Sequence, residues 1–301
     1  MRDLDRVPPE LLTLRDWVRW GASRFQEAGL SFGHGTDNAI DEAAALVLHT
    51  LHLPVDLSVV YWDARLTAEE AEAVLARVRR RIRERMPLPY LTHEAWFSGL
   101  PFYVDQRVLI PRSPLAELIE QGFQPWLDPE AVQAVLDVGT GSGCIAVACA
   151  YAFPRARVDA VDVSPDALEV ARVNVRRHNV AERVELLESD LYAALPAGRR
   201  YDLIVSNPPY VDRRRMDELP PEYRHEPASA LAAGEDGLDY ARRLIDGAAE
   251  LLNPGGLLVL EVGASDAALQ AVYPRLPLTW VELERGGEGV FLISAEELRS
   301  L

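Results

Sequence analysis

The motif Asn207-Pro-Pro-Tyr210 has the composition needed to hold a planar NH2 group during a group transfer. Its two prolines fix φ and remove backbone donors, so the loop is stiff and presents carbonyl oxygens. The side-chain oxygen of Asn207 and the carbonyl of Pro208 can accept both hydrogens of one nitrogen and orient it toward a methyl donor. They also stabilise the positive charge that develops on this nitrogen. We therefore predict Asn207, Pro208, Pro209 and Tyr210 as catalytic residues, with Tyr210 stacking on the planar group.

The same motif has two other interpretations. Asn-Pro commonly starts turns, so a rigid turn without chemistry is the structural alternative. The exocyclic amines of adenine, cytosine and guanine also pose the same chemical problem as an amide. The motif therefore predicts methyl transfer to a planar nitrogen and leaves the substrate open.

A second motif, Asp137-Val-Gly-Thr-Gly-Ser-Gly143, follows an apolar stretch and indicates a cofactor loop. Glycine allows positive φ and close approach of a ligand. The dinucleotide fingerprint needs a different glycine spacing, and the loop has no Lys for a phosphate-binding Walker motif. Asp137 would repel a pyrophosphate but suits the amino group of S-adenosylmethionine. We predict this cofactor, with S-adenosylhomocysteine as product, and the binding residues Asp137, Gly139, Thr140, Gly141, Ser142 and Gly143.

Two further carboxylates follow the next two predicted strands. Asp162 can accept both ribose hydroxyls, and Asp190 can accept the adenine amino group. Either can instead cap a helix, since Ser164-Pro-Asp166 is a good helix start. Three carboxylates after three successive strands, together with the glycine loop, favour cofactor binding.

The elements around these motifs alternate between strand and helix from about residue 115 onward. This alternation predicts a Rossmann-like, doubly wound α/β fold, in which ligands bind at the carboxyl ends of the strands. The expected strands are 132–138, 157–163, 184–187, 201–206, 256–262 and 289–294, and the expected helices include 144–153 and 165–179.

The first 92 residues have apolar positions at helical spacing and predict a separate helical domain. Thr67-Ala-Glu-Glu70 is a capping box that opens one of its helices. The arginines between Arg77 and Arg85 are expected to form a solvated face, or else to contact ribosomal RNA or an acidic partner. We expect a β-hairpin linker over 93–114, with strands in 96–104 and 107–110, and a catalytic domain over 115–301.

The composition limits the possible partners. The chain of 301 residues has a net charge of −16 and a pI of about 4.8, which argues against naked DNA or RNA and fits a small-molecule, neutral or basic protein substrate. No apolar stretch reaches the ~18 residues of a membrane span. No signal peptide is recognised, so a cytoplasmic protein without membrane or DNA partners is expected. Cys144 and Cys149 are expected to be small buried residues, and no metal site is predicted.

These motifs together resemble those of the protein-glutamine methyltransferases. The resemblance rests on Val108-Leu-Ile-Pro-Arg112, the glycine loop, Asn207-Pro-Pro-Tyr210 and Gly234-Glu-Asp-Gly237, and covers nearly the whole chain. It implies a class I S-adenosylmethionine-dependent methyltransferase with an N-terminal helical substrate-recognition domain. It further implies that Asn207 and the backbone at Leu191 bind the cofactor, and that 207–210 bind a glutamine side chain.

One branch of this family acts on class-1 peptide-chain release factors, and the other acts on the third protein of the large (50S) ribosomal subunit. The release-factor branch carries Pro-Arg-Pro-Asp-Thr-Glu where this chain reads Pro111-Arg-Ser-Pro-Leu-Ala-Glu117. The stretches Phe32-Gly-His-Gly-Thr-Asp-Asn38 and Tyr223-Arg-His-Glu-Pro227 also resemble the ribosomal-protein branch. The implied partner is therefore a basic ribosomal protein, free or in an assembly intermediate.

Three alternatives remain from the sequence. They are a release-factor enzyme, a nucleic-acid amino methyltransferase and a non-catalytic cofactor-binding scaffold. The sequence also leaves open whether His34, His225 and Glu226 are acid-base groups or structural residues.

Overall fold

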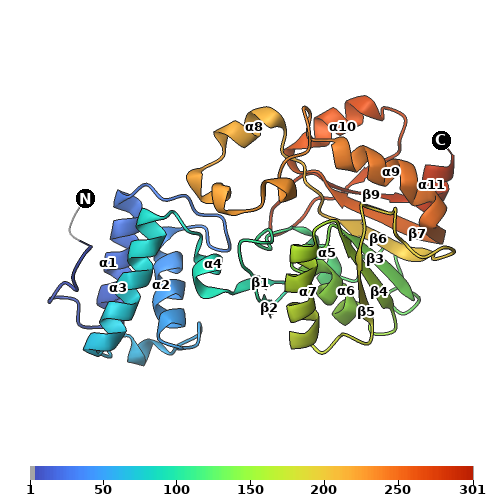
Figure 1. Ribbon diagram of the computed structural model, residues 1–301. Helices are drawn as coiled ribbons and strands as arrows, with labels where there is room; N and C mark the ends of the chain where they lie inside the picture. Colours follow the sequence, from blue (N-terminus) through green and yellow to red (C-terminus); the bar gives the residue numbers. More distant parts are fainter. Residues whose placement is uncertain (1–3, 301) are drawn as a thin grey trace. The chain divides into compact units, whose positions relative to one another are not determined.

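The computed structural model describes residues 4–300, which divide into two compact units (Figure 1). The helical unit contains the chain up to Glu94 together with Pro220–His225. The larger unit contains Ala95–Leu219 and the chain from Glu226 onward. The first boundary lies two residues beyond the expected one, so residues 95–114 of the expected linker belong to the larger unit.

The larger unit is built on a seven-stranded sheet in the order β5-β4-β3-β6-β7-β9-β8. The first five strands in this order are parallel, β9 is antiparallel to β7, and β8 is antiparallel to β9. The strands are β3 Ala134–Val138, β4 Arg157–Asp162, β5 Val184–Glu188, β6 Tyr201–Ser206, β7 Leu252–Glu261, β8 Thr279–Trp280 and β9 Val290–Ser294. This sheet confirms the expected Rossmann-like class.

The chain runs outward from β3 through β4 to β5 and then returns to pair β6 with β3. The strand order therefore reverses between β3 and β6, which is where doubly wound sheets bind their ligands. The glycine loop follows β3 and the Asn207-Pro-Pro-Tyr210 loop follows β6. The topology thus places both motifs at one edge.

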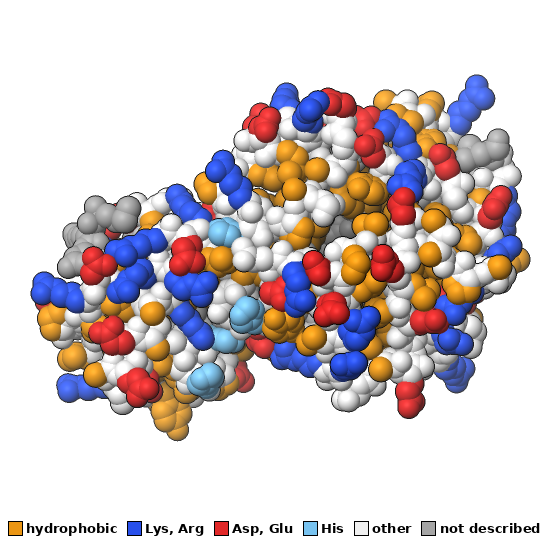
Figure 2. Space-filling view, in the orientation of Figure 1, with side chains coloured by type: hydrophobic (Ala, Val, Ile, Leu, Met, Phe, Trp, Pro, Cys, Tyr) orange, Lys and Arg blue, Asp and Glu red, His pale blue; other side chains and the backbone are white. Residues whose placement is uncertain are grey.

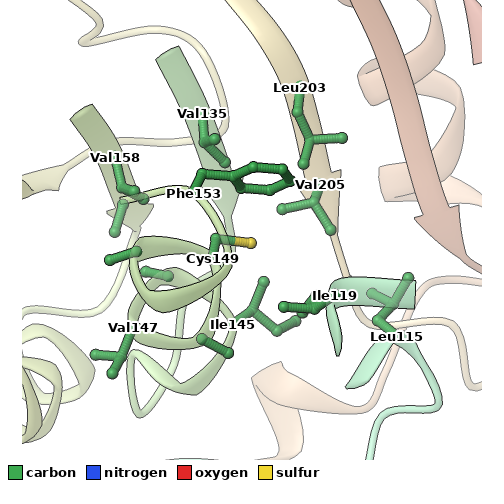
Figure 3. Packing of buried hydrophobic residues seen from close by; sticks show 14 of the residues in the cluster. Leu115, Ile119, Val135, Ile145, Val147, Cys149, Phe153, Val158, Leu203 and Val205 are labelled. Carbon is green, nitrogen blue, oxygen red and sulfur yellow. The ribbon is translucent and has the colours of Figure 1, made fainter. Parts of the chain in front are cut away.

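Helices cover both faces of the sheet (Figure 1). One face packs on α5, α6 and α7, and the other packs on α9, α10 and α11. Figure 3 shows the first of these cores, where Phe153 and Cys149 face Val135 and Val205 of the sheet. Both cysteines are buried and free, as expected. The helices are α5 Leu115–Glu120, α6 Cys144–Ala152, α7 Pro165–Arg177, α8 Arg213–Glu218, α9 Asp239–Leu251, α10 Asp266–Val272 and α11 Ala295–Arg299.

The expected hairpin is present but shorter than the sequence suggested. Its strands are β1 Ala95–Phe97 and β2 Leu100–Phe102, joined by Ser98 and Gly99, which both have positive φ. This is the conformation of a tight two-residue hairpin turn. The expectation of a strand over 107–110 was wrong. Asp105 accepts the backbone N–H of Arg107 at 3.0 Å and also binds its guanidinium, so the chain turns there instead of extending.

The helical unit packs four helices around Trp17, Phe25, Leu46 and Leu75. The helices are α1 Leu14–Glu27, α2 Ala39–Thr50, α3 Ala68–Arg83 and α4 Leu88–Thr92, and single turns of 3₁₀ helix occur at Val59–Tyr61 and Pro221–His225. The capping box of Thr67 and Glu70 opens α3 as predicted. Within residues 4–300, no helix is both long and apolar enough to cross a bilayer.

The arginines of α3 are engaged inside the helical unit, so the expectation of a solvated face was wrong for its central member. Arg81 is buried and binds Glu42 at 2.6 Å and the carbonyl of Ser31 at 2.8 Å. The other arginines of α3 also have partners: Arg77 binds Thr50, Arg79 binds the carbonyl of Leu4, Arg80 binds Glu84 and Arg83 binds Asp5. Arg85, two residues beyond the end of α3, binds the carbonyl of Gly29. The visible face of this unit accordingly mixes basic and acidic side chains (Figure 2).

Glu222 explains why Pro220–His225 belongs to the helical unit. Its side chain is fully buried, accepts the backbone N–H of Ser31 at 3.0 Å, and lies 3.0 Å from Arg85 and 3.5 Å from Arg81. Burial alone would raise the pKa of the Glu222 carboxyl, but backbone N–H donors, that of Ser31 first, together with Arg81 and Arg85 hold it below the usual value. A buried carboxylate needs such partners, and they fix the segment in place.

Candidate functional site

A cavity opens at the carboxyl edge of the parallel strands. Its open volume, which includes space continuous with the solvent, is about 880 Å³, and its described walls come from the larger unit. Figure 2 shows hydrophobic side chains gathered around a hollow in this unit. The lining residues from the predicted motifs are Gly139, Gly141, Asp162, Asp190, Leu191, Asn207, Pro208 and Pro209.

The three glycines of the loop after β3 serve two purposes. Gly139 and Gly141 line the cavity with φ of +73° and +55°, and a Cβ on either would meet nothing within 4 Å. Their need for glycine comes from the backbone conformation. Gly143 does not line the cavity, and its Cβ would lie 3.2 Å from that of Ala171. The absence of a side chain at Gly143 therefore allows α6 to approach α7. The sequence analysis had instead predicted Gly143 as a cofactor-binding residue.

Asp137 lies beneath the loop and is fully buried. Its Oδ2 accepts the Thr140 hydroxyl at 2.6 Å and the Ala146 N–H at 3.0 Å, so it ties the loop to the start of α6. Its Oδ1 has no hydrogen-bond partner among the described residues. Burial raises the pKa of this carboxyl to about 7. Asp137, Thr140 and Ser142 do not line the cavity and lie in or beneath the loop that does. Their contact with the cofactor remains a prediction.

Asp162 ends β4 and lines the cavity. Its two oxygens accept the backbone N–H groups of Gly141 at 2.8 Å and Ser164 at 2.9 Å. Burial raises the pKa of Asp162, while these N–H donors partly oppose the rise. Each carboxylate oxygen has a second lone pair, so the side chain can still accept ribose hydroxyls.

Asp190 and Leu191 line the cavity after β5. Asp190 is more than half exposed and forms an ion pair with Arg243 at 2.9 Å. Leu191 has a φ of +51°, and its carbonyl accepts the Ser189 hydroxyl at 2.7 Å. A leucine with positive φ is strained, and such strain collects at ligand sites. Both residues, which the sequence analysis predicted to bind the cofactor, therefore lie at the cavity.

Asn207, Pro208 and Pro209 enter the cavity from the end of β6. The Ser206 hydroxyl donates to the carbonyl of Val138 at 2.6 Å and joins the ends of β6 and β3. Tyr210 is not a lining residue. Its hydroxyl donates to Glu261 at 3.0 Å, so Tyr210 is anchored to the end of β7. The prediction that Tyr210 stacks on the substrate did not include this contact.

The histidines and Glu226 have structural contacts. The rings of His34 and Tyr223 lie 4.5 Å apart, and His225 Nε2 donates to the carbonyl of Glu84 at 2.7 Å, both within the helical unit. Glu226 is buried in the larger unit and accepts the guanidinium of Arg112 at 2.6 and 2.8 Å. None of these side chains lines the described cavity.

The sequence reading missed one wall of the cavity. Arg107, Val108 and Leu109 line it, although this stretch had been expected to be a strand. The signal was present in the motif Val108-Leu-Ile-Pro-Arg112. The further lining residues that were missed are Val138, Val163, Ser164, Ala167, Ser189, Ser206, Pro227, Ser229, Ala230 and Tyr240.

Comparisons with known proteins agree with this arrangement. Residues 122–220 match the family model "Methyltransferase small domain", and residues 16–92 match "PrmC N-terminal domain". The chain is 52% identical over 295 residues to a protein named ribosomal protein uL3 glutamine methyltransferase in Neisseria meningitidis serogroup B, covering 98% of this chain and 97% of that protein. A protein of the same name in Burkholderia pseudomallei is 51% identical over 298 residues, covering 97% of each.

Among solved structures, the catalytic domain of hMettl16 in complex with a MAT2A 3′UTR hairpin shares the fold. The TM-score is 0.52 at 18% identity, with 75% of this chain and 80% of that chain covered. At this identity the likeness concerns the fold alone.

Proposed function

The chain belongs to the protein-glutamine methyltransferase family that includes the ribosomal protein uL3 glutamine methyltransferases, and we propose that it methylates the side-chain amide nitrogen of a glutamine in ribosomal protein uL3. The observation that carries the proposal is the 52% identity over 98% of the chain. Both parts of the chain match, since the helical and catalytic regions each fit a family model.

The cavity fits S-adenosylmethionine. It offers a carboxylate at Asp162 for ribose hydroxyls, two glycines that permit close approach, and apolar walls at Val163 and Pro208. Asp137 lies beneath the glycine loop and outside the cavity wall, and its negative charge is proposed to favour an ammonium group bound on that loop. When bound, S-adenosylmethionine supplies an electrophilic methyl group.

The loop after β6 is proposed to prepare the glutamine. An amide nitrogen is a weak nucleophile because its lone pair is delocalised into the carbonyl. Asn207 and the carbonyl of Pro208 accept its two hydrogens, direct the nitrogen toward the donor and stabilise the positive charge that develops there. The stiffness of two consecutive prolines keeps these acceptors in place without reorganisation.

The substrate is proposed to be uL3 before it is packed into the mature subunit. A chain of net charge −16 is repelled by an RNA-covered particle and attracts a basic protein. Of the arginines of α3, Arg81 is buried by its partners within the helical unit and is not available to RNA. Substrate recognition is assigned to the helical unit, and the reaction is expected in the cytoplasm, where ribosomal proteins are made.

The test is labelling by a radioactive methyl donor. The purified chain is incubated separately with free uL3, a class-1 release factor, duplex DNA and mature large subunits from cells that lack this activity. Label on free uL3, located on a glutamine by mass spectrometry, is the expected result. Label on the release factor but not on uL3 would overturn the substrate, and equal labelling of free uL3 and mature subunits would overturn the preferred substrate state. The variant Asn207→Ala is the inactive control.

A further inference from the structure

Glu261 ends β7 beside the strand that carries the Asn207-Pro-Pro-Tyr210 loop. Its side chain is buried, and each of its oxygens accepts one hydroxyl. Oε1 accepts from Tyr210 at 3.0 Å, and Oε2 accepts from Ser113 at 2.5 Å. One buried carboxylate therefore joins two segments that are distant in the sequence.

The first of these segments is the catalytic loop, whose last residue is closely enclosed. A Cβ on Gly263 would lie 2.6 Å from Cε2 of the Tyr210 ring, and a Cβ on Gly237 would lie 2.4 Å from its carbonyl oxygen. The Ser265 hydroxyl donates to the same carbonyl at 3.3 Å. Glycines at these two positions let neighbouring backbone pack against the ring and the carbonyl of Tyr210. The hydrogen bond to Glu261 holds its hydroxyl.

The second segment is the cavity wall that begins at Arg107. Val108 and Leu109 line the cavity, the N–H of Ile110 donates to Glu226 at 3.0 Å, and Ser113 ends the segment on Glu261. The wall and the catalytic loop thus share one anchor.

We propose that Glu261 is a positioning residue for methyl transfer, because through Tyr210 and Ser113 it sets the position of the catalytic loop relative to the cavity wall that faces the cofactor. This inference rests on the proposed methyl transfer to glutamine. The acceptor oxygens of Asn207 and Pro208 lie within three residues of Tyr210. If Tyr210 is no longer held in place, the positions of these oxygens also change. A misplacement of about 1 Å at a reacting group costs about 100-fold in rate.

The chain contains a matched control. Tyr201 begins the same strand, β6, and its hydroxyl donates to the buried carboxylate of Asp159 at 2.7 Å. Tyr201→Phe and Tyr210→Phe each remove one hydroxyl that binds a buried carboxylate, the first at the start of β6 and the second in the loop that follows it. A purely structural role predicts similar effects of the two substitutions on the rate.

The experiment measures single-turnover methylation of uL3 at saturating cofactor, cofactor affinity by calorimetry, and thermal unfolding. The proteins are the wild type, Glu261→Ala, Glu261→Gln, Tyr210→Phe, Ser113→Ala, Tyr201→Phe and the Tyr210→Phe/Glu261→Ala double variant. We expect Glu261→Ala to lower the rate by about 10- to 100-fold, with cofactor affinity changed by less than about twofold. Glu261→Gln keeps an acceptor oxygen for Tyr210 and should recover most of the rate, while Tyr201→Phe should leave it unchanged.

The double variant provides the decisive comparison. If Glu261 acts through Tyr210, then Tyr210→Phe adds little to the loss caused by Glu261→Ala. Multiplicative losses, a Glu261→Gln variant as slow as Glu261→Ala, or equal rates for Tyr201→Phe and Tyr210→Phe would overturn the inference. If Glu261→Ala does not fold, the comparison of Tyr210→Phe, Tyr201→Phe and Glu261→Gln decides it. A wild-type protein that does not label uL3 refutes the proposed function, whereas an active wild type with unaffected variants refutes only this inference.

Discussion

Glu226 holds the guanidinium of Arg112 with both of its oxygens, although the two residues lie 114 positions apart. One of these oxygens also accepts the N–H of Ile110 at 3.0 Å, so the bond supports the cavity wall directly. The observed contacts of Glu226 are therefore structural ones.

Glu226→Ala is expected to lower the free energy of unfolding by about 3 kcal/mol, because it removes the carboxylate that accepts from a partly buried guanidinium and from a buried N–H. Chemical denaturation measures the loss. The control is Glu130→Ala, which removes an exposed ion pair with Arg155 and should cost less than about 1 kcal/mol. Losses of equal size in the two variants would contradict a supporting role for Glu226.

Asp162→Ala is expected to weaken cofactor binding by about 1.5–3 kcal/mol, because it removes a charged acceptor of ribose hydroxyls. It also removes the acceptor of the Gly141 N–H. Asp162→Asn keeps one acceptor oxygen, so its cofactor affinity should lie between those of the wild type and Asp162→Ala. Titration calorimetry gives the affinities. Asp166→Ala, in the first turn of α7, is the control and should bind normally. Unchanged affinity in Asp162→Ala would exclude the ribose assignment.

Asp137 is expected to make stability depend on pH. Burial raises its pKa in the folded state to about 7 from an ordinary value of 3.8. Between these values the folded state keeps a proton that the unfolded chain has lost. The contribution of Asp137 is therefore greatest below about pH 4 and declines up to about pH 7, by at most about 1.4 kcal/mol per unit.

The variant Asp137→Asn removes this titration and isolates the effect from that of other groups. The unfolding free energy of the wild type, measured relative to the variant, should fall between pH 5 and pH 7 and then level off. A constant difference across this range would show that Asp137 titrates like an exposed carboxyl.

The same carboxyl provides a test of its place in the cofactor site. An ammonium group bound on the glycine loop favours the charged form of Asp137 beneath it, so binding of S-adenosylmethionine near pH 6 should release a proton from the protein. Calorimetry in buffers of different ionisation enthalpy measures this release. It should disappear in Asp137→Asn, and a release of equal size in both proteins would assign the proton to another group.

Asn207→Ala is expected to lower the single-turnover rate by about 100-fold or more at saturating donor, because it removes an acceptor that strengthens as charge develops. Its effect on stability should be small, since Asn207 lies at the cavity. Asn253→Ala is the control, because its amide donates to Asp202 at 2.6 Å and does not line the cavity. A near-normal rate in Asn207→Ala would mean that the nitrogen is held by other groups.

The parts of the fold that depend on local pattern were predictable from sequence. The strands before the glycine loop and before Asn207, and the capping box at Thr67, follow from periodicity and capping rules, and the structure confirms them. Because the carboxyl ends of parallel strands share an edge, the meeting of both motifs at one cavity was predictable as well.

The parts that depend on distant partners were not predictable. Arg81 looks like one member of a charged helix face, and only Glu42 and Glu222, 39 and 141 positions away, make it a buried residue. Gly143 resembles its neighbours in the loop, but its neighbour in space is Ala171. The stretch after Asp105 has the apolar residues of a strand, but the Asp105 side chain binds Arg107 and the chain forms a turn there. Such outcomes depend on contacts that no local pattern contains.

The inclusion of Pro220–His225 in the helical unit limits how the protein can be dissected genetically. A gene fragment that ends at Glu94 encodes the four helices but not the Glu222 carboxylate that accepts the N–H of Ser31 and lies beside Arg81 and Arg85. Among the described residues of that fragment, Glu42 is then the one buried counter-charge of Arg81. The helical unit is thus not a detachable module, and a chimera that exchanges it between relatives must exchange 220–225 as well. Recombination between family members is expected to keep these two stretches of DNA together.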